Sequence, residues 1–301
     1  MSVLVAAGLD AGLGEPPRRA HPVVWMGSYL NRASQLVSAS PPTRAALAGG
    51  ATWLAGAATA AAAGLAVDCT AARLPQPWRA LARGTALWPL LSARLLFTEV
   101  AAVEDALRDG PDAGRLAAAR IVSRDTTCLT PAEVRAAAIE SLAENLSDSV
   151  VAPLCWYVVA GLPGAGLYRF ANTADAVWGY RCSRWHHAGR VAARADDALN
   201  LGPARLTAAL LGGGVDWRRL RREAGRTPSP NAGWPMAALA LRLDLRLAKP
   251  HSYVLNASGA APEAGDIDRA LHVIRRAIAV AVAVAACATH IINYRPLGGR
   301  R

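Results

Sequence analysis

The sequence predicts an all-α, polytopic membrane protein. Of the 301 residues, 53% are hydrophobic and 18% are charged, which is more apolar than an average soluble protein. Residues 45–67 carry no charge over 23 positions, which is long enough for one helix to cross a bilayer. Residues 277–294 form a second apolar run, and Arg275, Arg276 and Arg295 flank it where their side chains can reach the membrane interface.

The N-terminal region, residues 1–44, is expected to contain a loop followed by a helix. Pro16, Pro17 and Pro22 forbid one continuous helix, so we expect the helix to begin near Val23. The region is basic, which is typical of a cytoplasmic flank beside a membrane span. We expect no cleavable signal peptide, because the first apolar run is only about nine residues long and no basic stretch precedes it.

Residues 78–103 are a third candidate span, although charged residues interrupt it. Arg83, Arg94 and Glu99 lie within this segment, and charges at the depth of a bilayer are expensive. If the segment spans, these side chains therefore face protein or water rather than lipid.

For residues 45–67 a buried core helix is the alternative to a membrane span, because alanine and glycine are only weakly hydrophobic.

A further helix is predicted to begin at Thr130, at the start of the stretch TPAEVRAAAIESLAENLSDSVVAP. Thr130 is a preferred N-cap residue, and Pro131 suits the first helical position. Glu133 lies three residues after the cap, which is the spacing of a capping box. We therefore expect the backbone donors at this helix N-terminus to be satisfied locally.

Three acidic residues are predicted to share one face of this helix. Glu140, Glu144 and Asp148 follow one another at intervals of four, so they line up if the helix runs on through residue 147. Like charges at this spacing repel, and acids late in a helix oppose its dipole. We therefore expect a cation to face them; a solvated acidic face is the alternative.

Residues 149–178 are expected to form a re-entrant helical hairpin. The uncharged run 149–168 is long enough to cross a membrane, but GLPGAG at 161–166 interrupts it. A hairpin would keep the acidic face and the polar segment 169–200 on one side of the membrane. A full crossing, which stays open, would separate them.

The charge pattern excludes several function classes. The formal net charge of +11 comes almost entirely from arginine, because Lys249 is the only lysine. No Walker-type phosphate loop is present, and a Schiff-base mechanism would need Lys249, which has no evident activating partner in the sequence. Zinc-finger spacings and aromatic-interleaved basic repeats are absent, so nucleic acid is not an expected partner. Five scattered cysteines without a CxxC pair argue against a disulfide framework and a zinc site.

Arginine, carboxylate and amide side chains recur in a pattern that favours magnesium and phosphate. The set comprises Arg124 and Asp125, the acidic face, Asn172 and Asp175, and Asp196, Asp197 and Asn200. Magnesium is usually held by one or two carboxylates plus substrate phosphates, and arginine binds the phosphates. The residues alone therefore predict a membrane-embedded enzyme with magnesium–phosphate chemistry at its cytoplasmic face. The basic segment that contains Arg181 and Arg184 includes His186 and His187, which would point apart on a helix and are not expected to share a metal.

Four motifs follow one another along the chain: HPVVWMGSYLNR, RDTTCLTPAEVRAAAIESLAENLSDSVVAP, FANTADAVWGYRCSRW followed by RADDALNLGPARL, and SPNAGWPMAALA. Together they resemble the CobD/CbiB family of cobalamin biosynthesis, and the resemblance covers nearly the whole chain. It implies one integral membrane domain over residues 1–301, multi-pass in the cell membrane. It also implies a ligase that forms an amide bond between adenosylcobyric acid and aminopropanol phosphate, or a related amino-alcohol phosphate, to give adenosylcobinamide phosphate.

The resemblance marks motif positions along the chain, and the chemistry of their side chains suggests candidate roles. The catalytic candidates are Arg124, Asp125, Asp196 and Asp197. The substrate-binding candidates are Asn145, Asn172, Asp175, Tyr180, Asn200, Arg205 and Asn231. The metal candidates are Glu140, Glu144 and Asp148, with magnesium and ATP as expected cofactors. The expected partners are the corrinoid and amino-alcohol phosphate substrates, membrane lipid and other corrin-pathway enzymes.

The chain departs from the family pattern at a few positions. Serine replaces glycine at Ser123 and Ser149, and Ala174, Arg181 and Glu15 stand where leucine, lysine and aspartate are common. Two other functions stay open. A transporter would use the intramembrane charges as a substrate path, although no inverted repeat is visible. A membrane scaffold for corrinoid enzymes would consume no ATP.

Overall fold

The computed structural model describes residues 1–37, 41–180 and 185–294. These residues are helical almost throughout, and their only named strands form one short antiparallel hairpin. The predicted all-α class is therefore confirmed. The chain divides into two compact units. Of the described residues, the first unit contains those within 1–92, 152–199 and 281–294, and the second contains 93–151 and 200–280.

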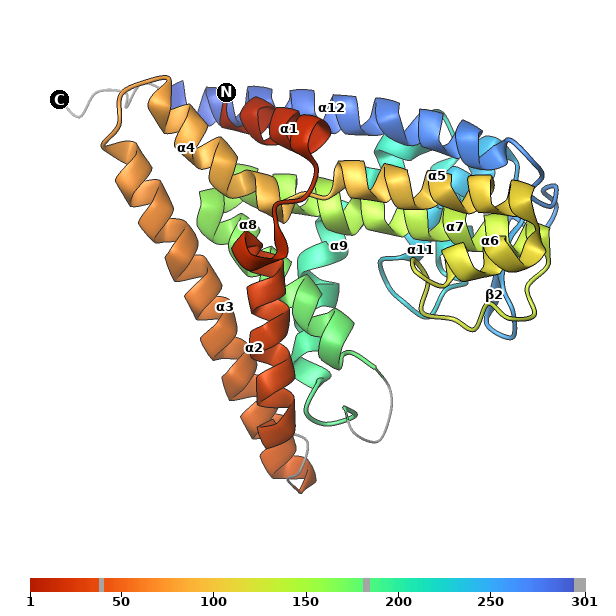
Figure 1. Cartoon of the computed structure of the whole chain (residues 1–301), viewed down its shortest axis with the longest axis horizontal. Coiled ribbons are helices and arrows are strands. Elements are labelled where there is room, and N and C mark those ends of the chain that lie inside the picture. Colours follow the sequence, from red (N-terminus) through yellow and green to blue (C-terminus); the bar gives the residue numbers. More distant parts are fainter. Residues whose placement is uncertain (38–40, 181–184, 295–301) are drawn as a thin grey trace. The chain divides into compact units, whose positions relative to one another are not determined.

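The first unit consists of helices that pack lengthwise. Its elements are α1 (Ser2–Leu13), η1 (Arg18–Ala20), α2 (Pro22–Val37), α3 (Pro42–Ala72), α4 (Trp78–Leu87), η2 (Trp88–Leu90) and α8 (Ala152–Trp178), with the beginning of α9 (Arg190–Gly212) and the end of α12 (Asp266–Tyr294). α3 runs along α8, α2 packs against both, and α1 packs against α4 (Figure 1). The helix expected from about Val23 begins at Pro22, because the fixed φ of proline suits a first helical turn.

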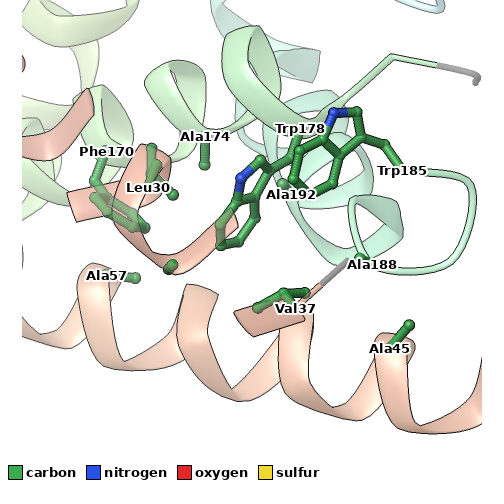
Figure 2. Close-up of a cluster of buried hydrophobic side chains, with 11 residues drawn as sticks. Leu30, Val37, Ala45, Ala57, Phe170, Ala174, Trp178, Trp185, Ala188 and Ala192 are labelled. Atoms are coloured by element: carbon green, nitrogen blue, oxygen red, sulfur yellow. The ribbon is translucent and has the colours of Figure 1, made fainter. Parts of the chain in front are cut away.

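Small residues and stacked rings build the core of the first unit. Gly56 lets α3 approach α8, since a Cβ there would lie 2.1 Å from the Phe170 ring. The indole N–H of Trp178 donates to the Ser34 hydroxyl (2.9 Å), and its ring stacks on Trp185 (Figure 2). Both contacts lie within one buried cluster that joins α2, α3, α8 and the start of α9.

The break predicted within GLPGAG is confirmed. Helix α8 is interrupted at Ala160 and Gly161, and Gly161 has a φ of +64°, a conformation that favours glycine. The N–H of Leu162 starts the second half of the helix and donates to the Asp68 carboxylate (3.0 Å). Asp68 also pairs with Arg83 (2.8 Å). The path of this segment through a membrane, as a re-entrant hairpin or a full crossing, stays a prediction.

The second unit is organised around α7. Its elements are α5 (Ala93–Asp109), α6 (Pro111–Ala118), α7 (Pro131–Leu146), a π-helical turn (Ser147–Val151), α10 (Trp217–Ala224), α11 (Gly233–Leu243), β1 (Leu247–Lys249) and β2 (Tyr253–Leu255), with the remaining parts of α9 and α12. Helices α5, α6 and α11 and strand β1 all pack against α7. The predicted capping box is present: the Thr130 hydroxyl accepts from the Glu133 N–H (3.3 Å), and the Glu133 carboxylate accepts from the Thr130 N–H (2.8 Å).

Four helical segments are long and apolar enough to cross a membrane. They are Pro42–Ala72, Trp78–Asp109, Pro131–Trp178 and Asp266–Ile292. The second of these is not one continuous helix, because α4 ends at Leu87 and a 3₁₀ turn containing Pro89 precedes α5. Two of the three charges within it meet protein, whereas Arg94 is exposed. Arg83 pairs with Asp68, and Glu99 pairs with Arg120 (2.6 Å).

Candidate functional site

Glu140 lies buried on α7 and is paired with Arg124. Arg124 belongs to the loop between α6 and α7, and its guanidinium donates to the Glu140 carboxylate and to the backbone carbonyl of Ala248 (3.3 Å). Only 2% of the Glu140 side chain is exposed, and a buried carboxylate requires a cation or hydrogen bonds. Arg124 is thus a cation of the kind that the acidic face was expected to meet.

The Arg124–Glu140 pair is incomplete. Glu140 Oε1 is buried and has no hydrogen-bond partner among the described residues. The Tyr253 side chain lies beside Glu140, and burial raises the pKa of Tyr253 above its ordinary value, with the Glu140 carboxylate raising it further. The phenol of Tyr253 therefore keeps its proton at neutral pH; it interacts with Glu140, and its hydroxyl also donates to the Met236 sulfur (3.8 Å).

The β1–β2 hairpin brings residues to this pair that the sequence did not single out as site residues. Lys249 lies opposite Tyr253 in the antiparallel register, and β1 packs against α7. Directly opposite residues of a hairpin share one face, so both side chains lie near the pair, and the charge of Lys249 acts on Glu140. His251, at the tip of the hairpin, has a φ of +58°.

A polar pocket of about 420 Å³ opens between the Arg124 loop and the hairpin. Its lining residues are Arg124, Asp125, Cys128, Leu129, Glu133, Lys249, Pro250 and His251. This volume is within the range of small-molecule sites, roughly 300–1,000 Å³. The lining combines two cations with two carboxylates, which suits a small ionic ligand rather than an apolar one.

Asp125 lies exposed on the wall of this pocket. Its carboxylate accepts hydrogen bonds from the backbone N–H and the hydroxyl of Thr127 (2.9 and 2.7 Å). These two bonds hold the pKa of Asp125 below its usual range. A carboxylate with a lowered pKa is a weak general base, so Asp125 suits an electrostatic role better than proton abstraction.

The other acids of the predicted face, Glu144 and Asp148, are half-buried. Glu144 lies in the last turn of α7, whereas Asp148 lies in the π-helical turn. The expected α-helical spacing of four is therefore corrected beyond residue 146, because a π turn closes on i→i+5. The Asn145 amide donates to the Ser141 carbonyl (2.9 Å). Within the described ranges no three His, Cys, Asp or Glu side chains are grouped to hold a metal.

Four predicted site residues lie together in the first unit. The Asn172 amide donates weakly to Asp196 (3.4 Å), which links α8 to α9. The charge of Asp197 acts on Asp175, one turn after Asn172. Tyr180, a predicted substrate-binding residue, is 56% exposed beyond the end of α8. The group formed by Asn172, Asp175, Asp196 and Asp197 is therefore acidic, and the Asn172 amide supplies one hydrogen bond within it.

Arg205 and Asn231 meet in the second unit. The Arg205 guanidinium donates to Asn231 Oδ1 (3.0 Å) and lies over the Trp234 ring, 4.8 Å from its centroid. Burial lowers the pKa of Arg205. The Trp217 ring packs against the Trp234 ring, and their centroids are 5.1 Å apart. The predicted residue Asn200 is buried and lies earlier in α9. Arg205 and Asn231 thus form one polar–aromatic cluster with the two tryptophans.

The predicted site residues therefore occur in three groups, one around Arg124, one around Asp196 and one around Arg205. Sequence reasoning missed Lys249, Tyr253 and His251 as site residues. The signal that could have identified Lys249 was its status as the single lysine in an arginine-rich chain. Two residues of the predicted basic segment, Arg181 and Arg184, lie outside the described residues.

Comparison with known proteins finds one family and several relatives. The family model described as "CobD/Cbib protein" matches residues 3–282. A "Probable cobalamin biosynthesis protein CobD" from Methanothermobacter thermautotrophicus is 38% identical over 263 residues, covering 84% of this chain and 85% of the relative. A "Cobalamin biosynthesis protein CobD" from Rhodobacter capsulatus is 38% identical over 296 residues, covering 92% and 93%. No solved structure matches the chain.

Proposed function

Because the chain belongs to the CobD/CbiB family, we propose that it acts in cobalamin biosynthesis as an ATP-dependent, amide-forming ligase. It joins a side-chain carboxylate of adenosylcobyric acid to aminopropanol phosphate, or to a related amino-alcohol phosphate, and produces adenosylcobinamide phosphate. The observation that carries the proposal is the polar pocket that has Arg124 and Lys249 on its wall and the buried Glu140 paired to Arg124. The negative charge of phosphate-bearing substrates is complementary to these two cations.

The reaction needs activation because a carboxylate is a poor electrophile. In the proposed route, a carboxylate oxygen of the corrinoid attacks the γ-phosphorus of ATP, and ADP leaves. The amine nitrogen then attacks the carbonyl carbon of the acyl phosphate, inorganic phosphate leaves, and the nitrogen loses a proton. Catalysis of phosphoryl transfer depends mainly on positioning and charge stabilisation, which arginine and lysine side chains supply.

The chain's own residues divide these tasks. Arg124 clamps a phosphate, and its bonds to Glu140 and to the Ala248 carbonyl fix its orientation. Asp196 or Asp197 accepts the amine proton, since the lowered pKa of Asp125 suits it less for that step. The amides of Asn172, Asn200 and Asn231 are candidates for binding the amide groups of the corrin.

Magnesium is implied by the use of ATP, and two residues fit it. Glu144 and Asp148 lie about one turn apart, and magnesium is commonly held by one or two carboxylates plus substrate phosphates. Glu140 does not fit, because its carboxylate is paired with Arg124 and is buried. When bound, the ion would neutralise charge on the transferring phosphoryl group.

The protein is expected to be multi-pass in the cell membrane with its active face cytoplasmic. Four apolar helical segments support the membrane location, and the arginine-rich N-terminal flank supports the orientation. Amine-reactive labelling in inverted versus right-side-out vesicles checks the orientation when mass spectrometry reads the label on the peptide that contains Lys249, the single lysine, separately from the N-terminal amine. Labelling from the periplasmic side would contradict it.

One assay tests the proposed reaction. Purified protein in detergent is incubated with adenosylcobyric acid, aminopropanol phosphate, ATP and magnesium, and mass spectrometry detects the amide product and ADP. We expect product only when all four are present. A Glu144→Gln protein should lose turnover, whereas Glu263→Gln, which changes an exposed glutamate, should retain it. Uptake into proteoliposomes without product would favour a transporter, and neither activity would favour a scaffold.

A further inference from the structure

Lys249 is the single lysine of the chain, and it lines the polar pocket beside Arg124. It is half-buried at the end of β1. Within the described residues its ammonium makes no hydrogen bond and no ion pair. Every other residue in the Lys and Arg total is arginine.

The two cations of the pocket are held together by the backbone. Arg124 donates to the carbonyl of Ala248, the residue before Lys249. Lys249 is itself fixed by the antiparallel register that places it opposite Tyr253. The bond from Arg124 to the Ala248 carbonyl therefore ties the Arg124 side chain to the strand that carries Lys249.

The nearby carboxylates already have partners. Glu140 is paired with Arg124, and Glu133 accepts from the N–H and hydroxyl of its capping box. Asp125 accepts two hydrogen bonds from a neighbouring threonine. Unlike these carboxylates, the Lys249 ammonium makes no hydrogen bond or ion pair with a described residue and acts on Glu140 only through its charge, so its three donors are available to an anion.

We propose that this pocket binds a phosphate group, with the Lys249 ammonium and the Arg124 guanidinium as its two cations. Arginine presents a planar fork to phosphate oxygens, and lysine adds a compact charge with three rotatable donors. Arg124 uses one N–H on Glu140 and one on the Ala248 carbonyl, so its remaining N–H groups are available to a phosphate oxygen. The identity of the ligand rests on the proposed function: the phosphate belongs either to the amino-alcohol phosphate or to ATP.

The single lysine makes this site directly observable. Reductive methylation of the purified protein in detergent with ¹³C-formaldehyde labels Lys249 and the N-terminal amine, and methylation keeps the positive charge. The same labelling of a Lys249→Arg protein leaves only the N-terminal signal and so assigns the Lys249 resonance. Thermal unfolding of labelled and unlabelled protein checks that methylation leaves the fold intact.

The labelled protein is titrated with inorganic phosphate, aminopropanol phosphate, ATP and unphosphorylated aminopropanol. We expect a saturable shift of the Lys249 signal with phosphate-bearing compounds and no shift with aminopropanol. A response to aminopropanol phosphate alone assigns the site to that substrate, and a response to ATP alone assigns it to the nucleotide. No response to any phosphate compound overturns the proposal.

The outcomes separate this site from the proposed reaction. If the protein makes the amide but the Lys249 signal never moves, the phosphate site is wrong and the ligase activity stands. If the signal saturates with a phosphate compound but no amide forms, the phosphate site stands and the ligase activity fails.

Steady-state kinetics give a second, independent readout. Lys249→Met should raise KM for the phosphate-bearing substrate about 10- to 100-fold, since a charge-assisted hydrogen bond is lost, and Lys249→Arg should recover most of that loss. Arg246→Met removes an exposed cation just before the same hairpin and should leave KM unchanged. Equal KM values for Lys249→Met and the wild type would overturn the proposal.

Discussion

Two buried arginine–glutamate pairs involve α7, and they differ in how completely they are satisfied. Arg135 binds Glu104 of α5 through two parallel bonds, Nε to Oε2 at 2.8 Å and Nη2 to Oε1 at 2.9 Å. Arg124 binds Glu140 but leaves Oε1 of that glutamate without a hydrogen-bond partner in the described chain. Burial does not distinguish them, because both arginine side chains are 13% exposed and the glutamates are 4% and 2% exposed.

The difference separates a structural contact from a site. A two-bond fork between arginine and carboxylate fixes both orientation and charge, so Arg135–Glu104 holds α5 against α7. A buried polar atom without a partner destabilises a fold and calls for an explanation, of which use by a ligand or a reaction is one. Arg124–Glu140 adjoins a polar pocket, whereas no pocket is needed to explain Arg135–Glu104.

The largest expected effect comes from breaking the complete pair. Glu104→Gln leaves the Arg135 charge buried without its counter-ion, so we expect a loss of about 3–5 kcal/mol in the free energy of unfolding. Thermal unfolding in detergent measures it. Asp105→Asn is the matched control on the same helix, because the Asp105–Arg108 pair is exposed and should contribute less than about 1 kcal/mol. Similar melting temperatures for the two variants would contradict a structural role for Glu104.

Breaking the incomplete pair should affect activity more than stability. Glu140→Gln keeps the shape of the side chain but removes the charge that orients Arg124, so we expect kcat/KM to fall by about 100-fold or more, roughly 2.7 kcal/mol. Its melting temperature should fall less than that of Glu104→Gln, because the released Arg124 can turn toward the open pocket. Equal losses of stability in both variants would make the two pairs equivalent and remove the distinction.

Local features of the fold followed from the sequence, whereas the site depended on distant contacts. The capping box at Thr130 and the break at Gly161 were predictable, because each depends on residues within a few positions and on backbone preferences. The bond from Arg124 to Ala248 joins residues 124 apart, and no periodicity indicates where a three-residue strand will pack. Lys249 therefore had no visible partner in the sequence, although the hairpin places it in the pocket.

The extent of the acidic face illustrates the same limit. A helix through Ser147 was expected, and α7 does continue to Leu146. The π-helical turn that follows over Ser147–Val151 has no cue in the local composition. Of the three predicted acids, the structure gives Glu140 a counter-ion and leaves Glu144 and Asp148 as half-buried candidates.

Removing the Tyr253 hydroxyl tests whether the incomplete pair extends into the hairpin. Tyr253→Phe should lower kcat about tenfold with little change in stability, since it removes one donor beside Glu140. The raised pKa of Tyr253 means that its proton is lost only at strongly alkaline pH. Titration of Tyr253 should therefore cause no change in the wild-type kcat between pH 7 and 9. Tyr29→Phe is the control, because the Tyr29 hydroxyl bonds the Thr52 carbonyl in the first unit. Unchanged kcat in Tyr253→Phe would confine the site to Arg124 and Glu140.

The smallest expected effect concerns Asp125, whose charge depends on local bonds rather than on a counter-ion. Its pKa is lowered first by the Thr127 N–H and then by the Thr127 hydroxyl. Activity that requires ionised Asp125 is therefore present above this lowered pKa and is lost as pH falls through it. Thr127→Val removes the hydroxyl bond and keeps the backbone bond, so the acid limb of kcat/KM should move to higher pH by less than about one unit. Thr127→Ser keeps a hydroxyl and should leave the acid limb of kcat/KM at the wild-type pH. If neither substitution moves the acid limb, the limb reports another group, and Asp125 is excluded from the reaction.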